Sequence, residues 1–137
     1  MELGTMGVWY ASDKLEPEQW LDFIATVERL GYDTQWYSEA TGYESMALGS
    51  FLLSHTTRLH IGSSIANIYA RDAVASRNGM KTLNRISKGR YILGLGVSHV
   101  PLVERFRGHT YGRPLAAMRA YLRHMQAEQD DADTWPV

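Results

Sequence analysis

The chain has 137 residues, of which 14 are Lys or Arg and 15 are Asp or Glu, and its formal net charge is −1. Hydrophobic residues make up 45% of it and cysteine is absent, which excludes disulfide scaffolds and thiolate zinc sites. The balanced charge disfavours nucleic acid as a partner. No apolar run approaches the ~20 residues of a membrane-spanning helix and residues 1–6 lack a secretory signal, so we expect a cytoplasmic protein without a membrane partner.

The first half of the chain alternates short β-prone runs with amphipathic segments. Residues 7–10 predict a strand, and Pro17 with apolar residues spaced three and four apart predicts a helix that ends near Gly31. The same order then recurs, because residues 34–37 are β-prone and residues 45–54 carry apolar side chains at helical spacing.

The second half repeats this order twice more. Residues 59–65 predict a third strand, and Asp72 is a suitable N-cap for a helix that ends at Gly89. Residues 91–97 form a nearly continuous apolar run, which is typical of a strand buried on both faces of a parallel sheet. Pro114 then opens a last helical segment.

Four successive strand and helix units predict an α/β fold with a parallel sheet and right-handed crossovers. Either an open doubly wound sheet or part of a (β/α)₈ barrel of the TIM type fits this order. A complete barrel takes about 250 residues, so the chain would supply about half of one. We expect residues 1–137 to form a single half-barrel domain in which residues 128–137 are a flexible tail.

A glycine pair follows the fourth predicted strand and resembles the start of a dinucleotide-binding loop. Gly94 and Gly96 match its first two glycines, but His99 stands where the third is required. We therefore favour glycines that relieve crowding or that let a flat ring approach the backbone.

Two titratable residues follow predicted strands, at the end where such folds bind ligands. Glu39 follows the second strand, where a carboxylate could bind a cofactor, take a proton, or simply serve as a loop charge or helix N-terminal partner. His99 follows the fourth strand, and imidazole suits acid or base work, although a lone histidine in a loop is more often structural. The histidines lack the paired helical spacing of metal ligands, so we expect no metal site.

Small residues surround the end of the third predicted strand, in the run Ser63-Ser64-Ile65-Ala66-Asn67. Small polar residues at this place can let backbone atoms touch a bound ring, and a β-branched residue can buttress it. An ordinary strand end followed by a turn would have the same sequence pattern.

Several separated motifs together resemble one family. Residues 36–40, 62–72, 93–99 and 108–122 are similar, in order and spacing, to the luciferase-like monooxygenase superfamily and within it to the branch of F420-dependent oxidoreductases. The resemblance extends over about residues 7–125.

The resemblance implies a (β/α)₈ barrel whose C-terminal mouth holds the deazaflavin F420 or, alternatively, FMN. It also implies a non-prolyl cis peptide bond between Ser64 and Ile65. Ala40 departs from relatives that have a catalytic histidine there, which disfavours sugar-phosphate dehydrogenase chemistry. The residues expected at the site are Glu39 and His99 as catalytic groups and Glu39, Ser63, Ser64, Ile65, Asn67, Gly96, Val97 and Ser98 as cofactor contacts.

The resemblance implies an oxidoreductase that passes hydride between F420 and a small organic substrate. Two alternatives stay open, namely an FMN-dependent monooxygenase and a half-barrel that binds or assembles without catalysing. Four barrel strands would leave two edges and a half-covered inner face, which invite pairing. We therefore expect a homodimer, the commonest closed arrangement of soluble homo-oligomers.

Overall fold

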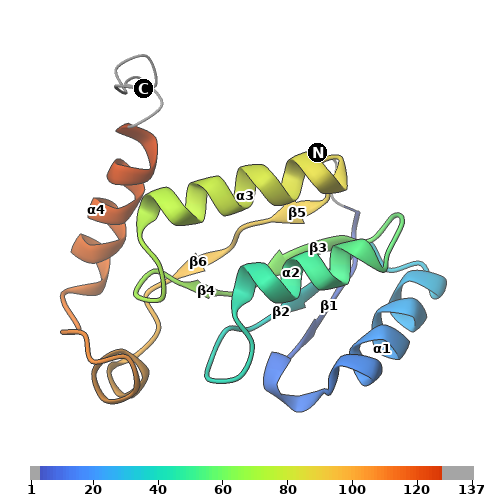
Figure 1. Ribbon diagram of the computed structural model, residues 1–137, viewed down its shortest axis with the longest axis horizontal. Coiled ribbons are helices and arrows are strands. Elements are labelled where there is room, and N and C mark those ends of the chain that lie inside the picture. The colour runs from blue at the N-terminus through green and yellow to red at the C-terminus, as the bar shows by residue number, and fades with distance from the viewer. Residues whose placement is uncertain (1–3, 128–137) are drawn as a thin grey trace. The chain divides into compact units, whose positions relative to one another are not determined.

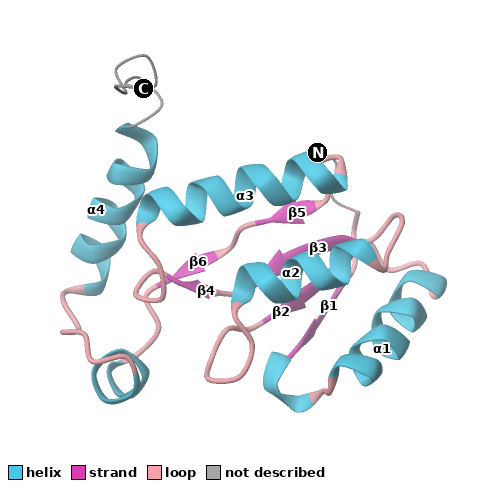
Figure 2. Cartoon of the chain, viewed as in Figure 1, coloured by secondary structure: helices cyan, strands magenta, loops and turns pink. Residues whose placement is uncertain are grey.

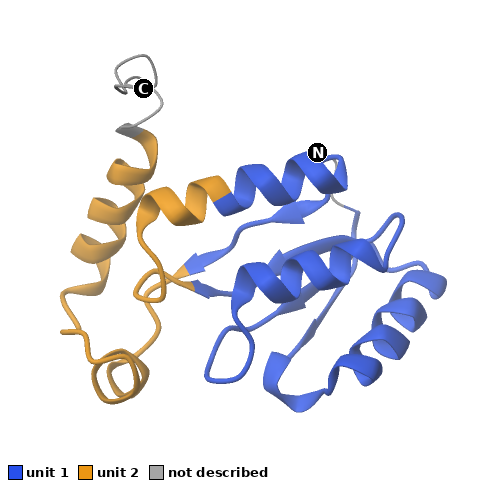
Figure 3. Cartoon of the chain, viewed as in Figure 1, with its two compact units in different colours: residues 1–66, 79–95 blue, residues 67–78, 96–137 orange. Residues whose placement is uncertain are grey.

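The computed structural model describes residues 4–127 of the chain (Figure 1). The chain divides into two compact units, residues 1–66 with 79–95 (unit 1) and residues 67–78 with 96–137 (unit 2), as Figure 3 shows. The expected tail, residues 128–137, lies outside the described residues, and the single-domain organisation stays a prediction.

Helices and short strands alternate along the described residues (Figure 2). In chain order the elements are β1 (Gly7–Tyr10), η1 (Ser12–Lys14), α1 (Pro17–Arg29), β2 (Thr34–Tyr37), α2 (Ser45–Ser54), β3 (His60–Ser63), β4 (Ala66–Asn67), α3 (Ala73–Ser87), β5 (Tyr91–Ile92), β6 (Leu95–Gly96), η2 (Pro101–Phe106) and α4 (Pro114–Ala127). Here η1 is a 3₁₀ turn and η2 a π-helix, which the sequence pattern did not predict.

The predicted helix boundaries are largely confirmed. Pro17 opens α1, and Gly31 follows its end with a φ of +85°, a conformation that suits glycine. The Asp72 carboxylate accepts the N–H of Ala75 at 2.8 Å and so caps α3, as predicted. Gly89 follows α3 with a φ of +87°. Among residues 4–127, none of the helices has both the length and the apolar character needed to cross a bilayer.

Unit 1 contains a four-stranded parallel sheet in the order β1-β2-β3-β5, which confirms the predicted parallel pairing. The register aligns Val8 with Gln35 and Gln35 with Ile61, and Ile61 pairs with Tyr91. Since paired residues of parallel strands share a face, these side chains lie on one side of the sheet. This is the side covered by helices, because Ile61 and Tyr91 belong to the hydrophobic core.

The core of unit 1 joins this face of the sheet to three helical segments. Trp20 of α1 and Leu52 of α2 are fully buried, and Leu83 of α3 is 4% exposed. Burying a large apolar side chain contributes about 1.5–3 kcal/mol, so these contacts account for the packing of the helices on the sheet.

The opposite face of the same sheet is more open. Trp9 pairs in register with Trp36 on this face, and 54% of the Trp9 surface is exposed. The ring of Trp36 lies across neighbouring backbone, since a Cβ added at Gly62 would come within 2.5 Å of it and one added at Gly7 within 2.9 Å. The two glycines therefore give the Trp36 ring room to lie against the sheet.

Two predicted strands are shorter than expected. The strand predicted at 59–65 ends at Ser63, and the run 91–97 contains two short strands, β5 and β6. Gly94 lies between β5 and β6, and its backbone bonds the hydroxyl of Ser63. These side-chain bonds take the place of backbone hydrogen bonds between strands at this point. The predicted burial on both faces is also wrong, because residues 92–97 are only partly buried. Strands β4 and β6 form a separate two-stranded sheet.

Unit 2 is built around tyrosine side chains. The Tyr121 hydroxyl of α4 bonds the Ser76 hydroxyl and the carbonyl oxygens of Arg71 and Asp72, the latter two at 3.0 Å. These contacts attach α4 to the beginning of α3. Outside these helices, the rings of Tyr69 and Tyr111 stack with their centroids 5.9 Å apart.

Candidate functional site

The carboxyl ends of β1, β2, β3 and β5 lie at one edge of the sheet in unit 1, because the strands are parallel. Open α/β sheets and (β/α)₈ barrels bind their ligands at this edge. The segments that leave the strands there contain Ser12, Ser38 with Glu39, Ser64 with Ile65, and Gly94.

The ends of β1 and β2 are joined through serine. The N–H of Ser12 donates to the hydroxyl oxygen of Ser38 at 3.2 Å, and the two hydroxyls lie 3.5 Å apart. Ser12 is fully buried, and its carbonyl oxygen accepts the indole N–H of Trp20 at 3.3 Å. The turn after β1 is therefore fixed both to the segment after β2 and to α1.

Glu39 is buried at the beginning of α2. Its side chain is 6% exposed, and Oε1 accepts the N–H of Ser45, the first residue of α2, at 3.2 Å. A carboxylate beside the first N–H groups of a helix satisfies a free donor and suits the helix dipole. The structural role that we observe for Glu39 is therefore that of a partner for the helix N-terminus. The alternative interpretation, that Glu39 is a solvated charge in a loop, is wrong. The proposed contact of Glu39 with a cofactor stays a prediction.

Tyr37 holds the same helix start from the sheet. Its hydroxyl donates to the carbonyl oxygen of Ser45 at 2.6 Å and lies 3.3 Å from the hydroxyl of Tyr91. Burial, followed by the charge and hydrogen bonding of Tyr91, raises the pKa of Tyr37 well above its ordinary value. The phenol thus stays neutral and serves as a donor.

Asp13 anchors the loop between β2 and α2, a contact that sequence reasoning missed. Its carboxylate accepts the N–H groups of Thr41, Gly42 and Tyr43 at 3.2, 3.0 and 3.3 Å. Partial burial tends to raise the pKa of Asp13, but these hydrogen bonds and that of the Ser12 hydroxyl lower it below its ordinary value. The loop that carries Glu39 toward α2 is therefore held by a charged group in η1, the short helix that follows β1.

Ser63 and Gly94 are in close backbone contact. The Ser63 hydroxyl donates to the carbonyl oxygen of Gly94 and accepts its N–H, each at 3.0 Å. A Cβ added to Gly94 would lie 2.2 Å from the carbonyl oxygen of Ser63. The interpretation that this glycine relieves crowding is therefore confirmed.

Ser64 and Ile65 are joined by a non-prolyl cis peptide bond, at the position that the resemblance implied. The N–H of Ser64 donates to the carbonyl oxygen of Tyr37 at 2.6 Å. Its carbonyl oxygen accepts the indole N–H of Trp9 at 3.1 Å. Ser63 ends β3 and is buried, while Ser64 and Ile65 follow it and are partly exposed. Because β2 and β3 are parallel, these three residues lie at the same edge of the sheet as Glu39.

The remaining predicted site residues, Asn67, Gly96, Val97, Ser98 and His99, belong to unit 2. Asn67 is buried, and its side-chain oxygen accepts the N–H of Tyr69 at 3.0 Å. The carbonyl oxygen of Gly96 accepts the N–H of Ile68 at 3.0 Å, and Val97 is partly buried.

Ser98 and His99 lead into the π-helix of unit 2. Ser98 has a φ of +55°, and its carbonyl oxygen accepts the Tyr111 hydroxyl at 3.1 Å. The side chain of His99 is exposed, while its carbonyl oxygen accepts the N–H groups of Leu102 and Val103 at 3.1 Å. Its imidazole is therefore accessible to solvent and to small molecules.

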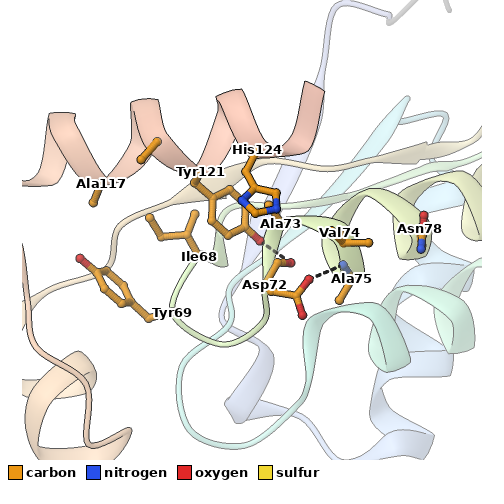
Figure 4. Close-up of a pocket in the computed structure, with 11 residues that line it drawn as sticks. Ile68, Tyr69, Asp72, Ala73, Val74, Ala75, Asn78, Ala117, Tyr121 and His124 are labelled. Atoms are coloured by element: carbon orange, nitrogen blue, oxygen red, sulfur yellow. Dashed lines mark hydrogen bonds between the residues drawn. The ribbon is translucent and has the colours of Figure 1, made fainter. Parts of the chain in front are cut away.

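Unit 2 also contains a groove of about 820 Å³ between the beginning of α3 and α4. Figure 4 shows Tyr121 pointing toward Asp72, with Ile68 and Tyr69 farther along the groove. None of the predicted site residues lines it. Within residues 4–127, no group of three or more His, Asp or Glu side chains is arranged to hold a metal ion.

Comparison with known proteins gives a family match over nearly the whole chain. Residues 3–129 match the model of a family described as luciferase-like monooxygenase. The chain is 35% identical over 123 residues to a Mycobacterium tuberculosis protein named "Putative coenzyme F420-dependent oxidoreductase Rv3520c", covering 89% of this chain and 35% of that protein. It is 28% identical over 119 residues to the 5,10-methylenetetrahydromethanopterin reductase of Methanolobus tindarius, covering 79% of this chain and 35% of the reductase.

Solved structures match the same fold. The coenzyme F420-dependent tetrahydromethanopterin reductase of Methanopyrus kandleri superposes with a TM-score of 0.76 at 20% identity, over 90% of this chain and 40% of the reductase. The oxygenating constituent of 3,6-diketocamphane monooxygenase from Pseudomonas putida, in complex with FMN, superposes with a TM-score of 0.73 at 15% identity. This match covers 90% of this chain and 39% of the monooxygenase chain. The predicted fold class, an α/β fold forming part of a TIM-type barrel, is confirmed. The chain spans about 35% of the length of its curated relatives.

Proposed function

The chain belongs to the luciferase-like monooxygenase family, and on this basis we propose that it acts as an oxidoreductase that transfers hydride between coenzyme F420 and a small organic substrate. The observation that carries the proposal is the 35% identity, over 89% of the chain, to a relative named for F420 dependence. The chain spans about 35% of the length of that relative. The activity of the whole relative is therefore a proposal for this chain.

The edge formed by the carboxyl ends of the strands in unit 1 suits a flat heterocycle. Trp9 exposes 54% of its surface there, and Ser64 and Ile65 are partly exposed. Pockets for ring-shaped ligands combine apolar and aromatic surfaces with a few fixed polar groups, and this edge offers both. We assign Ser63, Ser64 and Ile65 to the wall behind the ring, with Ser63 acting through the bond that fixes Gly94.

F420 supplies the hydride chemistry when it is bound, and the protein supplies binding, orientation and electrostatics. Glu39 would accept a hydrogen bond from the cofactor in addition to that from Ser45, since a carboxylate can accept several. The exposed imidazole of His99 would give or take the substrate proton. Asn67, Gly96, Val97 and Ser98 are proposed as further cofactor contacts.

An FMN-dependent monooxygenase is the second candidate, because the matching family is described by its monooxygenases. The two candidates share the requirement for a planar tricyclic ring. They differ in the reaction partner, which is an organic substrate for F420 and dioxygen for a monooxygenase.

We further propose that two copies of the chain associate as a homodimer. The sheet of unit 1 has β1 and β5 at its edges, and Trp9 lies on its open face with 54% exposed surface. Unpaired strand edges and exposed apolar faces favour association, and two-fold dimers are its commonest closed form. Sedimentation of the 137-residue chain should give a dimer, and a compact monomer at micromolar concentration would contradict it.

Fluorescence titration of the purified chain with F420 and with FMN tests the function. Preferred binding of F420 supports the first proposal, and preferred binding of FMN supports the second. Binding of neither at high micromolar concentration contradicts both and favours a non-catalytic half-barrel. His99→Ala is expected to leave cofactor affinity unchanged and to lower turnover, so the variant separates proton transfer from binding.

A further inference from the structure

The indole of Trp9 links two strands that are not neighbours. Trp9 lies in β1 and Ser64 follows β3, while β2 lies between these strands in the sheet. The Nε1–H group of Trp9 nevertheless donates to the carbonyl oxygen of Ser64 at 3.1 Å. An indole has a single N–H donor, so the polar group of this side chain is committed to the backbone of Ser64.

The backbone around Ser64 is held by other elements as well. The N–H of Ser64 donates to the backbone carbonyl oxygen of Tyr37 in β2 at 2.6 Å, and the N–H of Ala66 donates to the carbonyl oxygen of Gly94 at 2.7 Å. With Trp9 as donor to its carbonyl oxygen, Ser64 is bonded on both sides. Residues 64–66 therefore have a backbone position that three separate segments determine.

Core packing does not account for Trp9. Its side chain is 54% exposed, whereas Trp20 in the core is fully buried. An exposed indole N–H can bond to water at little cost, so a direct bond to Ser64 is not needed to satisfy it. What this bond adds is a fixed relation between the end of β1 and the segment after β3.

We infer that Trp9 is a positioning residue of the proposed site, whose indole N–H fixes residues 64–66 and whose exposed ring offers an aromatic surface to a planar heterocycle. The inference rests on the proposed function, which places such a ring against Ser64 and Ile65. Aromatic side chains favour stacked or edge contacts with flat rings, which suits a residue at this edge.

The first test uses the ligand-free chain and needs no cofactor. Trp9→Phe keeps an aromatic ring and removes the N–H donor. We expect hydrogen exchange of the Ser64 and Ala66 amides to become severalfold faster, because local opening of this segment becomes easier. The Ile61 amide, which donates to Arg90 at 2.9 Å in the same region, should keep its rate.

Tyr10→Phe is the matched control, because Tyr10 lies on the same strand and its ring contacts Trp20 and Phe23 on the opposite face. It should leave the exchange of both amides unchanged. Unaltered exchange of Ser64 and Ala66 in Trp9→Phe would overturn the inference, whatever the chain binds.

The second test titrates the same variants with F420. We expect Trp9→Phe to raise the Kd about fivefold, the effect of one lost hydrogen bond, and Trp9→His, which keeps a ring N–H, to restore part of the affinity. If the wild type binds F420 and Trp9→Phe binds it with the same Kd, this inference is overturned and the proposed function is not. Failure of the wild type to bind F420 or FMN overturns the proposed function, while amide exchange still decides whether Trp9 fixes residues 64–66.

Discussion

The carboxylate of Asp13, in η1, accepts the N–H of Gly42, in the loop between β2 and α2, with 3.0 Å between the nitrogen and Oδ1. The same carboxylate accepts the N–H groups of Thr41 and Tyr43, so one side chain of η1 fixes the backbone that leads into α2. Glu39 lies in the same connection and is itself bonded to the first residue of α2. The proposed site is therefore built on a loop whose shape depends on a carboxylate from another element.

Replacing Asp13 by Asn should destabilise unit 1. An amide keeps one acceptor oxygen but places an N–H₂ group against backbone donors, and we expect a loss of about 1 kcal/mol in the free energy of unfolding. Urea denaturation followed by circular dichroism measures this loss. Asp22→Asn, at an exposed position of α1, is the matched control and should stay within about 0.5 kcal/mol of the wild type.

Acid should weaken the same contact. Hydrogen bonds hold the pKa of Asp13 below its ordinary value of 3.8 in the folded chain. A group whose pKa is lowered on folding contributes stability above its unfolded pKa, and this contribution is lost as the pH falls through the folded pKa. The difference in melting midpoint between wild type and Asp13→Asn should be full at pH 6 and shrink below about pH 3.8. A difference that grows on acidification would contradict the assignment.

Gly94→Ala should be strongly destabilising. The added methyl group would lie 2.2 Å from the carbonyl oxygen of Ser63, and two backbone segments would have to separate. We expect a cost of about 3 kcal/mol, measured by chemical denaturation. Gly112→Ala meets only the Tyr69 hydroxyl, at 3.9 Å, and should cost less than about 1 kcal/mol. Equal effects of the two substitutions would contradict the close approach.

Arg90→Lys should destabilise the end of α2. The Arg90 guanidinium donates to the carbonyl oxygens of Leu53, Thr56 and Leu59 at 2.9 to 3.0 Å. A lysine ammonium cannot reproduce this planar arrangement, so we expect a loss of about 2 kcal/mol. Thermal unfolding of this variant beside Arg85→Lys, an exposed position of α3, separates the loss of the contacts from the loss of a guanidinium.

Glu39 allows the structural and functional roles to be separated. Glu39→Ala leaves the N–H of Ser45 without this acceptor and should cost about 2 kcal/mol, whereas Glu39→Gln keeps an oxygen acceptor and should cost less. If Glu39 also contacts F420, Glu39→Gln should weaken binding about tenfold while the chain stays folded. Affinity equal to that of the wild type would remove Glu39 from the proposed cofactor contacts.

Local rules predicted most of the fold. Asp72 is a helix cap and Gly31 a helix stop because their neighbours in sequence determine those roles. The division of the 91–97 run could not be predicted in this way, since it depends on the side chain of Ser63. Asp13 was missed for the same reason, because its partners at Thr41 to Tyr43 lie about 30 positions away.

The close contact of Trp36 with Gly62 makes these two positions interdependent. A Cβ at residue 62 would come within 2.5 Å of the indole, so a larger residue there requires a smaller one at 36. Neighbouring substitutions of this kind are strongly non-additive. Homologues with a larger residue at position 62 should have a smaller one at position 36, and a variant library that randomises only residue 62 would recover little beyond glycine.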